Sequence, residues 1–375
     1  MSFRNGNAAV VLEDGRMFNG VSFGADRDAE GEVVFTTSMT GYQEVATDPS
    51  FRGQIVCMTY PIIGNYGVTH DDEQSRQPWI SGMIVRDYND VPSNWRSERS
   101  LAAYFRAHDI PAISGVDTRA LTRHIRTIGA MRGLLVASVD GRSPEALRER
   151  ARNAWSPSDA NVVADVSSDE QRVVGSGDLH VVLLDCGVKE NILESLRRRG
   201  VHVTVVPFDT PIEDIRALKP DGVLTSPGPG DPENADPAIE TVRAVVDDGV
   251  PYLGVCLGHQ LLALAIGAST SKLKFGHRGG NHPVMDLESG RVYVTAQNHG
   301  YQVDSGSVPT GDGWRVSQVN LNDGSVEGLA HAELPIFSVQ YHPEGSPGPQ
   351  DNQYVFDRFL DLLRDRKRRG EGERV

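Results

Sequence analysis

In the second half of the chain, short apolar runs alternate with segments whose apolar residues recur every three or four positions. The runs predict β-strands, and the periodic segments predict amphipathic helices. In chain order, alternating strand and helix, these elements cover residues 180–185, 190–199, 201–206, 212–218, 222–225, 238–247, 250–255 and 257–266. This alternation predicts an α/β domain built on a doubly wound, mostly parallel sheet with helices on both faces.

The first half of the chain has a different pattern, in which glycines and prolines such as Gly41 and Pro49 separate short strands and turns. A helix-like stretch at 144–154 follows, and after it comes a segment rich in serine, glycine and acidic residues with little apolar periodicity. We therefore place domain boundaries by composition. The expected order is an N-terminal domain in residues 1–155, a linker in 156–178 and a second domain in 179–375.

Cys256 lies at the junction between the expected strand 250–255 and the expected helix 257–266. Gly254 and Gly258 flank it and permit a sharp turn with close packing of strand against helix. The sulfur can then stand clear of the backbone at a helix N-terminus, where the helix dipole favours a thiolate. These features predict that Cys256 is a nucleophile.

Another apolar strand ends in the sequence Tyr-His-Pro-Glu, which contains His342 and Glu344. A thiol nucleophile needs a base, because a free cysteine of pKa ~8.5 is only about 3% thiolate at pH 7. His342 is the candidate base, and Glu344 can hold a ring nitrogen and fix the tautomer. The sequence thus predicts a Cys-His-Glu triad of Cys256, His342 and Glu344.

Residues 226–232, Ser-Pro-Gly-Pro-Gly-Asp-Pro, predict a stiff turn with exposed backbone amides that can approach a ligand carbonyl. Gly228 and Gly230 do not form a dinucleotide-binding fingerprint, because Glu233 occupies the third glycine position. A phosphate loop of the Gly-x-x-x-x-Gly-Lys-Ser/Thr type does not occur in the chain.

The elbow around Cys256, the His-Pro-Glu sequence and the turn at 226–232 resemble those of the class I, or triad, glutamine amidotransferases, which hydrolyse glutamine to release ammonia. Further segments are similar to the small subunit of carbamoyl-phosphate synthase, in collinear order over residues 8–363, and they are 36–44, 47–51, 60–67, 115–122, 274–284 and 298–301. The resemblance implies a class I amidotransferase fold preceded by a smaller mixed α/β domain that contacts a large subunit.

The resemblance also implies a glutamine site, in which the backbone N–H groups of Gly228 and Leu257 form the oxyanion hole. The implied glutamine-binding residues are Ser50, Gly228, Gly230, Leu257, Gln260, Asn298, Gly300 and Tyr301. Such hydroxyl, amide and backbone groups suit the ammonium, carboxylate and carbonyl of an amino acid. Tyr301 departs from the family pattern, in which phenylalanine is common, but a backbone contact survives that change. His299 is expected to be structural rather than catalytic.

By the same resemblance, this chain supplies ammonia to a large synthetase subunit in a heterodimer. That subunit would use ATP, Mg and bicarbonate to make carbamoyl phosphate for arginine synthesis, pyrimidine synthesis or both. This chain is expected to hold no cofactor. His277 and His282 raise the question of a metal, but no cysteine or carboxylate completes a ligand spacing, so none is expected.

Two alternatives stand beside this interpretation. The glutaminase subunit of another amidotransferase would share the triad, but such chains generally lack a domain like residues 1–155. A non-catalytic regulatory relative would share the fold, but it would be expected to lose a member of the triad. Cys256, His342 and Glu344 are all present.

Composition limits the remaining possibilities. The 375 residues suffice for two domains with their own cores. The net charge of -14, from 37 basic and 51 acidic residues, argues against partners such as nucleic acid and anionic membranes. Three cysteines form no disulfide framework, and Cys57 and Cys186 are expected to be buried as small apolar side chains. With no signal-like or membrane-spanning run, we expect a cytoplasmic protein.

Overall fold

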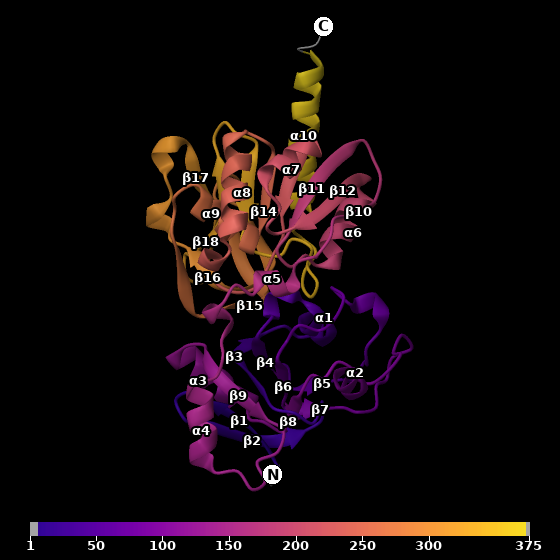
Figure 1. Cartoon of the computed structure of the whole chain (residues 1–375), viewed down its shortest axis with the longest axis vertical. Helices are drawn as coiled ribbons and strands as arrows, with labels where there is room; N and C mark the ends of the chain where they lie inside the picture. The colour runs from indigo at the N-terminus through magenta and orange to yellow at the C-terminus, as the bar shows by residue number, and fades with distance from the viewer. Residues whose placement is uncertain (1–6, 373–375) are drawn as a thin grey trace. The chain divides into compact units, whose positions relative to one another are not determined.

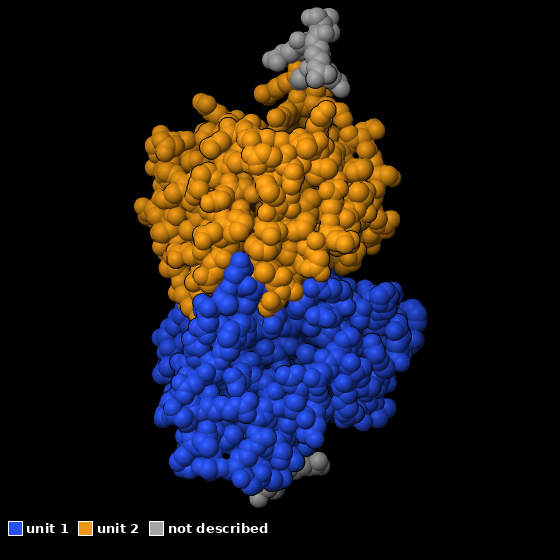
Figure 2. All heavy atoms as spheres, in the orientation of Figure 1, with its two compact units in different colours: residues 1–162, 274–279 blue, residues 163–273, 280–375 orange. Residues whose placement is uncertain are grey.

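The computed structural model describes residues 7–372, and the chain divides into two compact units (Figures 1 and 2). Unit 1 comprises residues 1–162 and 274–279, and unit 2 comprises residues 163–273 and 280–375. Composition did not predict that 274–279 belongs to the first unit. Backbone hydrogen bonds explain it, because the Ala130 N–H donates to the Lys274 carbonyl (2.8 Å) and the Thr37 N–H donates to the Arg278 carbonyl (3.0 Å).

Unit 1 is built on a closed seven-stranded barrel. In barrel order the strands are β1 (Ala8–Leu12), β2 (Met17–Ser22), β8 (Ala112–Ser114), β6 (Gly82–Ile84), β4 (Gln54–Met58), β3 (Ala29–Thr36) and β9 (Met131–Val136). The helices are α1 (Tyr42–Thr47), α2 (Leu101–Ala107), α3 (Thr118–Ile128) and α4 (Pro144–Arg152), and β5 (Ile62–Ile63) and β7 (Asp87–Tyr88) form a small ribbon. Short 3-10 turns are η1 (Pro49–Phe51), η2 (His70–Asp72) and η3 (Pro157–Asp159). The smaller mixed α/β domain implied by the resemblance is therefore a barrel with helices around it.

Strand β1 shows that a barrel strand need not alternate between apolar and polar residues. All five of its residues are buried. Ala8, Val10 and Leu12 belong to one core cluster, whereas Ala9 and Val11 belong to another that includes α4. Successive side chains of a strand point to opposite faces, so a strand covered on both faces is apolar throughout.

Unit 2 contains a ten-stranded sheet. In sheet order the strands are β10 (Arg172–Val174), β12 (Val201–Pro207), β11 (Leu179–Asp185), β13 (Gly222–Thr225), β14 (Tyr252–Val255), β19 (Ile336–Val339), β18 (Val326–His331), β17 (Trp314–Asn320), β15 (Thr270–Asp286) and β16 (Val292–Val303). The five strands from β12 to β19 pair in parallel. Antiparallel strands extend the sheet on both sides, so the predicted parallel arrangement forms its centre.

Helices cover both faces of this parallel centre, as the doubly wound prediction required. They are α5 (Val163–Val166), α6 (Glu190–Arg198), α7 (Ile212–Ala217), α8 (Asp236–Asp247), α9 (Leu257–Ala265) and α10 (Tyr354–Gly372), with 3-10 turns at η4 (Pro232–Asn234), η5 (Ser305–Ser307) and η6 (Thr310–Asp312). In β11, Val182 and Leu184 pack in the cluster that contains α8 and α9, whereas Val181 and Leu183 pack in the cluster that contains α6 and α10. The alternating strand directs its side chains into two helical layers.

The segment expected to be a linker, residues 156–178, contains η3, α5 and β10. Val163 and Val166 of α5 are buried, and β10 pairs with β12 at the edge of the sheet. The boundary between the two units, at 162/163, falls inside this segment. Within residues 7–372, none of the helices combines the length and apolar content that crossing a bilayer requires.

Parallel strands place their carboxyl ends at one edge of the sheet, and loops at that edge form binding sites in such folds. Cys256 follows β14 and residues 226–232 follow β13. His342 comes three residues after the end of β19. The predicted nucleophile, turn and base therefore share this edge of unit 2.

Candidate active site

Cys256 has an unusual backbone conformation, with φ 54° and ψ -103°, at the N-cap of α9. Non-glycine residues with positive φ are uncommon, and such strain, about 1–3 kcal/mol, concentrates at functional sites. A Cβ on Gly254 would lie 2.4 Å from the Gly258 carbonyl oxygen, and a Cβ on Gly258 would lie 2.3 Å from that of Thr225. The two glycines thus permit the tight strand-to-helix turn predicted from the sequence.

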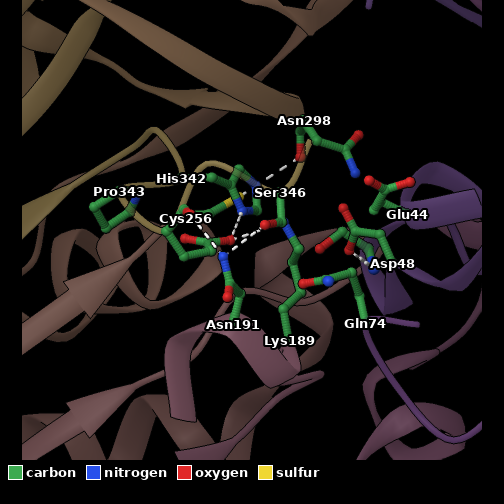
Figure 3. A network of polar contacts seen from close by, with 12 residues as sticks. Glu44, Asp48, Gln74, Lys189, Asn191, Cys256, Asn298, His342, Pro343 and Ser346 are labelled. Carbon is green, nitrogen blue, oxygen red and sulfur yellow. Dashed lines mark hydrogen bonds and ion pairs between the residues drawn. The ribbon is translucent and has the colours of Figure 1, made fainter. Parts of the chain in front are cut away.

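His342 and Glu344 form a buried pair, with His342 Nδ1 2.8 Å from Glu344 Oε1. The His342 N–H donates to the Ala296 carbonyl (2.9 Å), which ties this loop to β16. Because Nδ1 is engaged, Nε2 is the ring nitrogen available for chemistry, and it makes no hydrogen bond within the described residues. Figure 3 shows Cys256 and His342 close together, with Lys189 and Asn191 of the same unit nearby.

Lys189 is a residue of this site that the sequence analysis missed. Its Nζ lies 2.9 Å from Glu344 Oε1, and the two side chains are 2% and 0% exposed. A buried ion is costly unless it is paired, so the lysine and the carboxylate depend on each other. Lys189 precedes α6 at the carboxyl edge of the sheet. The signal in the sequence that could have identified it is a lysine that closely follows a buried strand.

The charges of this cluster shift the pKa values of both acid–base groups. Burial raises the pKa of Glu344, but the charges of Lys189 and His342 outweigh burial and hold it below its ordinary value. Burial lowers the pKa of His342, but the charges of Glu344 and Cys256 outweigh burial and raise it above its ordinary value. The arrangement therefore favours an ionised Glu344 next to a protonated His342.

Asn191, in the first turn of α6, holds the loop that carries the pair. Its Nδ2 donates to the Glu344 carbonyl (3.0 Å) and to Ser346 Oγ (2.6 Å) (Figure 3). These contacts fix the backbone of Glu344 from the side of α6, whereas Ala296 fixes His342 from the side of β16. Asn191 also escaped the sequence analysis, because an exposed-looking polar residue at a helix start has many ordinary roles.

A second histidine, His259, lies in the first turn of α9 and invites comparison with His342. It is fully buried, and its Nδ1 contacts Ser338 Oγ at 2.8 Å. Burial lowers the pKa of His259 to about 3. A neutral imidazole without a carboxylate partner suits packing better than proton transfer, which leaves His342 as the acid–base candidate.

The turn after β13 packs against the start of α9. A Cβ on Gly228 would lie 2.3 Å from the Cys186 carbonyl oxygen and 2.6 Å from Leu257 Cδ2, so only glycine fits there. Gly230 has φ 87°, which favours glycine for a second reason. The structure thus brings together Gly228 and Leu257, whose N–H groups are the implied oxyanion hole.

Strand β16 contributes Asn298, Gly300 and Tyr301 to the same region. Cys256 Sγ lies 3.6 Å from the Asn298 carbonyl oxygen, and Gln260 Nε2 donates to the Tyr301 carbonyl (3.0 Å). Tyr301 is therefore engaged through its backbone, which is the contact that a tyrosine-for-phenylalanine difference leaves intact. Gln260, Asn298 and Tyr301 lie beside the elbow, and Gly300 adjoins Tyr301 in the strand.

Ser50 belongs to unit 1, where it lies in η1 and its N–H donates to Asp48 Oδ1 (2.9 Å). Its place in a glutamine pocket stays a prediction. His277 belongs to unit 1 and His282 to unit 2. His299 is held by its Nδ1, which donates to the Tyr301 carbonyl (2.7 Å), in agreement with a structural role.

Comparison with known proteins adds two family matches. Residues 182–362 match the family model described as glutamine amidotransferase class-I. Residues 10–135 match the model described as carbamoyl-phosphate synthase small chain, CPSase domain. The first match lies almost wholly in unit 2, and the second lies in unit 1.

Curated relatives extend the similarity over nearly the full chain. A carbamoyl phosphate synthase small chain from Archaeoglobus fulgidus is 49% identical over 360 residues, which is 96% of this chain and 99% of the relative. One from Symbiobacterium thermophilum is 50% identical over 358 residues, covering 94% and 97%. A carbamoyl phosphate synthase pyrimidine-specific small chain from Halalkalibacterium halodurans is 51% identical over 362 residues, covering 96% and 98%.

Proposed function

Because the chain belongs to the carbamoyl phosphate synthase small-chain family and carries a class I glutamine amidotransferase domain, we propose that Cys256, His342 and Glu344 are its glutamine-hydrolysing triad. The observation that supports this most is the buried 2.8 Å contact between His342 Nδ1 and Glu344 Oε1, next to a cysteine in a strained elbow. This arrangement supports the proposal that a nucleophile, its base and an orienting carboxylate act together.

In the first half-reaction, the thiolate of Cys256 attacks the side-chain carboxamide carbon of glutamine. The carbonyl oxygen gains negative charge, which the N–H groups of Gly228 and Leu257 stabilise. As the tetrahedral intermediate collapses, the C–N bond breaks, and His342 Nε2 gives its proton to the departing ammonia. A glutamyl thioester on Cys256 remains.

In the second half-reaction, His342 is neutral at Nε2 and accepts a proton from water as that water attacks the thioester. The C–S bond breaks, glutamate leaves, and the protonated His342 again faces the thiolate of Cys256. Glu344 orients the imidazole through Nδ1 and stabilises its positive charge.

Lys189 acts through Glu344 in this scheme and is therefore a positioning residue. By lowering the pKa of Glu344, it keeps the carboxylate ionised and able to accept a hydrogen bond from His342 Nδ1–H. That bond assigns the other nitrogen, Nε2, to the reacting groups. Asn191 contributes by fixing the Glu344 backbone.

The released ammonia would pass to a large synthetase subunit, where ATP, Mg and bicarbonate would be used to make carbamoyl phosphate. The relatives' description as small chains and the match of residues 10–135 to a domain specific to them support this partner. Unit 1, which carries no member of the triad, would chiefly bind that subunit. An enclosed transfer would spare ammonia from protonation in solvent.

A glutamine analogue that carries a chloromethyl ketone tests the proposed nucleophile directly. We expect it to alkylate Cys256 stoichiometrically, with glutamine protecting, and to spare Cys57 and Cys186, which are buried thiols with raised pKa values. Peptide mass spectrometry locates the adduct. Alkylation of another cysteine with retention of an unmodified Cys256 would remove Cys256 from the mechanism.

A further inference from the structure

Gln340 is a fully buried polar residue between β19 and His342 that the sequence analysis did not consider. Its Oε1 accepts a hydrogen bond from Gln260 Nε2 at 3.0 Å. Gln260 is one of the glutamine-binding residues that the family resemblance implies. The contact links a residue outside the predicted site to one inside it.

The neighbours of Gln260 determine which end of its side-chain amide faces the ligand. The Tyr301 carbonyl, which can only accept, receives Gln260 Nε2 at 3.0 Å and His299 Nδ1 at 2.7 Å. The amide nitrogen must therefore point toward Tyr301. Its second hydrogen is taken by Gln340 Oε1, so both donors of Gln260 are used within the protein.

This leaves Gln260 Oε1 as the atom available to a ligand. It accepts no hydrogen bond within the described residues. It is also absent from the set of fully buried side-chain atoms that lack a partner, so the protein does not close it off from a ligand. Gln260 thus presents an acceptor, and the groups of glutamine that can use an acceptor are its ammonium and carboxamide N–H groups. If the Gln260 amide were turned over, its N–H groups would face the ligand and would repel the ammonium or carboxamide N–H groups of glutamine.

On the basis of the proposed glutaminase function, we infer that Gln340 is a positioning residue that holds Gln260 with Oε1 directed toward a nitrogen donor of the substrate. Gln260 Nε2 donates two hydrogen bonds, to the Tyr301 carbonyl and to Gln340 Oε1, and these restrain the amide at both hydrogens. With Gln340 removed, only the Tyr301 carbonyl holds Gln260, and the side chain gains rotational freedom that substrate binding must remove.

The other contacts of Gln340 do not explain why its side chain should be an amide. Its Nε2 makes no hydrogen bond within the described residues, so the only side-chain hydrogen bond that links Gln340 to them is the one to Gln260. Its backbone N–H donates to the Glu327 carbonyl (2.8 Å), and that bond survives any substitution other than proline. Changing the side chain therefore tests the link to Gln260 specifically.

The test measures glutaminase kinetics of the full chain with two substitutions at this position. Gln340→Met keeps the length but removes the acceptor, and we expect it to raise KM for glutamine about tenfold with kcat changed less than about threefold. Gln340→Glu keeps an oxygen in the same place and should recover most of the loss, because burial favours the protonated, neutral carboxyl, whose carbonyl oxygen still accepts from Gln260. Gln318→Met, at another buried glutamine of unit 2, is the matched control and should leave KM unchanged.

A double-mutant cycle with Gln260→Ala decides whether Gln340 acts through Gln260. We expect Gln340→Met to have no further effect on KM in the Gln260→Ala background. An unchanged KM in the single variant, or a full tenfold effect in both backgrounds, would overturn the inference. If Gln340→Met does not fold by circular dichroism, Gln340→Asn replaces it, because it keeps the amide but withdraws the oxygen by one methylene.

A parallel assay of Cys256→Ala separates this inference from the proposed function. Loss of turnover in Cys256→Ala together with unchanged kinetics in the Gln340 variants would refute only the role of Gln340. Retained turnover in Cys256→Ala would refute the proposed triad, whatever the Gln340 variants do.

Discussion

Cys57 in unit 1 and Cys256 in unit 2 are both buried cysteines associated with parallel strands, yet their surroundings differ completely. Cys57 lies inside β4, where burial among apolar side chains raises the pKa of its thiol to about 12. Cys256 follows the last residue of β14, has positive φ and faces a buried His-Glu-Lys cluster. The comparison teaches that two equally buried cysteines can have different surroundings, and that the position at the end of a strand and the charges placed there, rather than burial, make Cys256 the candidate nucleophile.

The two units extend this contrast. In unit 1 the barrel strands carry apolar side chains to both faces, so their residues are used for packing. In unit 2 the parallel strands are equally apolar, but the loops at their carboxyl edge carry Lys189, Gly228, Cys256 and His342. The barrel of unit 1 uses these residues for packing. The sheet of unit 2 does so as well, but it also carries the residues of the candidate site along one edge.

Among the variants that keep Cys256, the largest effect is expected from removing the base. His342→Asn should lower glutamine hydrolysis at least about a hundredfold, nearly as much as loss of Cys256, because nucleophile and base act as a unit. Steady-state glutaminase assays of the two single variants and the double variant measure this. Additive losses in the double variant would show that the two residues act independently.

Glu344→Gln should be less damaging than His342→Asn. An amide can still accept from His342 Nδ1, but it does not stabilise the imidazolium charge, so we expect a loss of about tenfold to a hundredfold. The same assay measures it. If the Glu344 change proved as damaging as the His342 change, the division between base and orienting group would be wrong.

Lys189→Met should move the pH profile rather than abolish activity. Lys189 lowers the pKa of Glu344, so its removal raises that pKa, and the carboxylate is protonated at a higher pH. The acid limb of the kcat/KM profile should then shift to higher pH, with an activity loss of about tenfold that grows as the pH falls. Lys189→Arg is the control that keeps the charge. An unshifted acid limb in Lys189→Met would contradict the role given to Lys189.

The smallest effect on catalysis is expected at the cysteine in unit 1. Cys57→Ala should leave glutaminase kinetics unchanged and lower the free energy of unfolding by about 1 kcal/mol, because it removes one buried sulfur. Thermal denaturation and the glutaminase assay together test this. A loss of turnover without unfolding would break the contrast between Cys57 and Cys256.

The sequence predicted the centre of unit 2 well, because strands and helices there alternate with clear periods. Gly254, Gly258 and Gly228 were identified as turn residues, and each lies where a Cβ would collide with backbone. The closure of the barrel could not be predicted, because strand pairing between β1 and β9 depends on residues far apart in the chain. The pattern of apolar and polar residues along one sequence does not show which distant strands pair.

The site residues that the sequence did not predict were missed for a similar reason, because their contacts depend on how separate segments of the chain pack together. Lys189 is distant in sequence from Glu344, and only the packing of α6 against the loop after β19 makes them partners. Gln340 precedes the His-Pro-Glu sequence by two positions, but its contact with Gln260 depends on how α9 lies against that strand. Local sequence was enough to propose the reacting groups, whereas the residues that contact them were found only in the three-dimensional structure.

The most direct test of the central claim compares two nitrogen sources in the complex of this chain with the proposed large subunit. With Cys256→Ser, carbamoyl phosphate formation from glutamine should fall at least about a hundredfold, because serine is a far weaker nucleophile near neutral pH. Formation from ammonia should stay near the wild-type rate, because the synthetase chemistry is proposed to lie in the other subunit. Undiminished synthesis from glutamine in this variant would contradict the proposal that Cys256 is the nucleophile of glutamine hydrolysis.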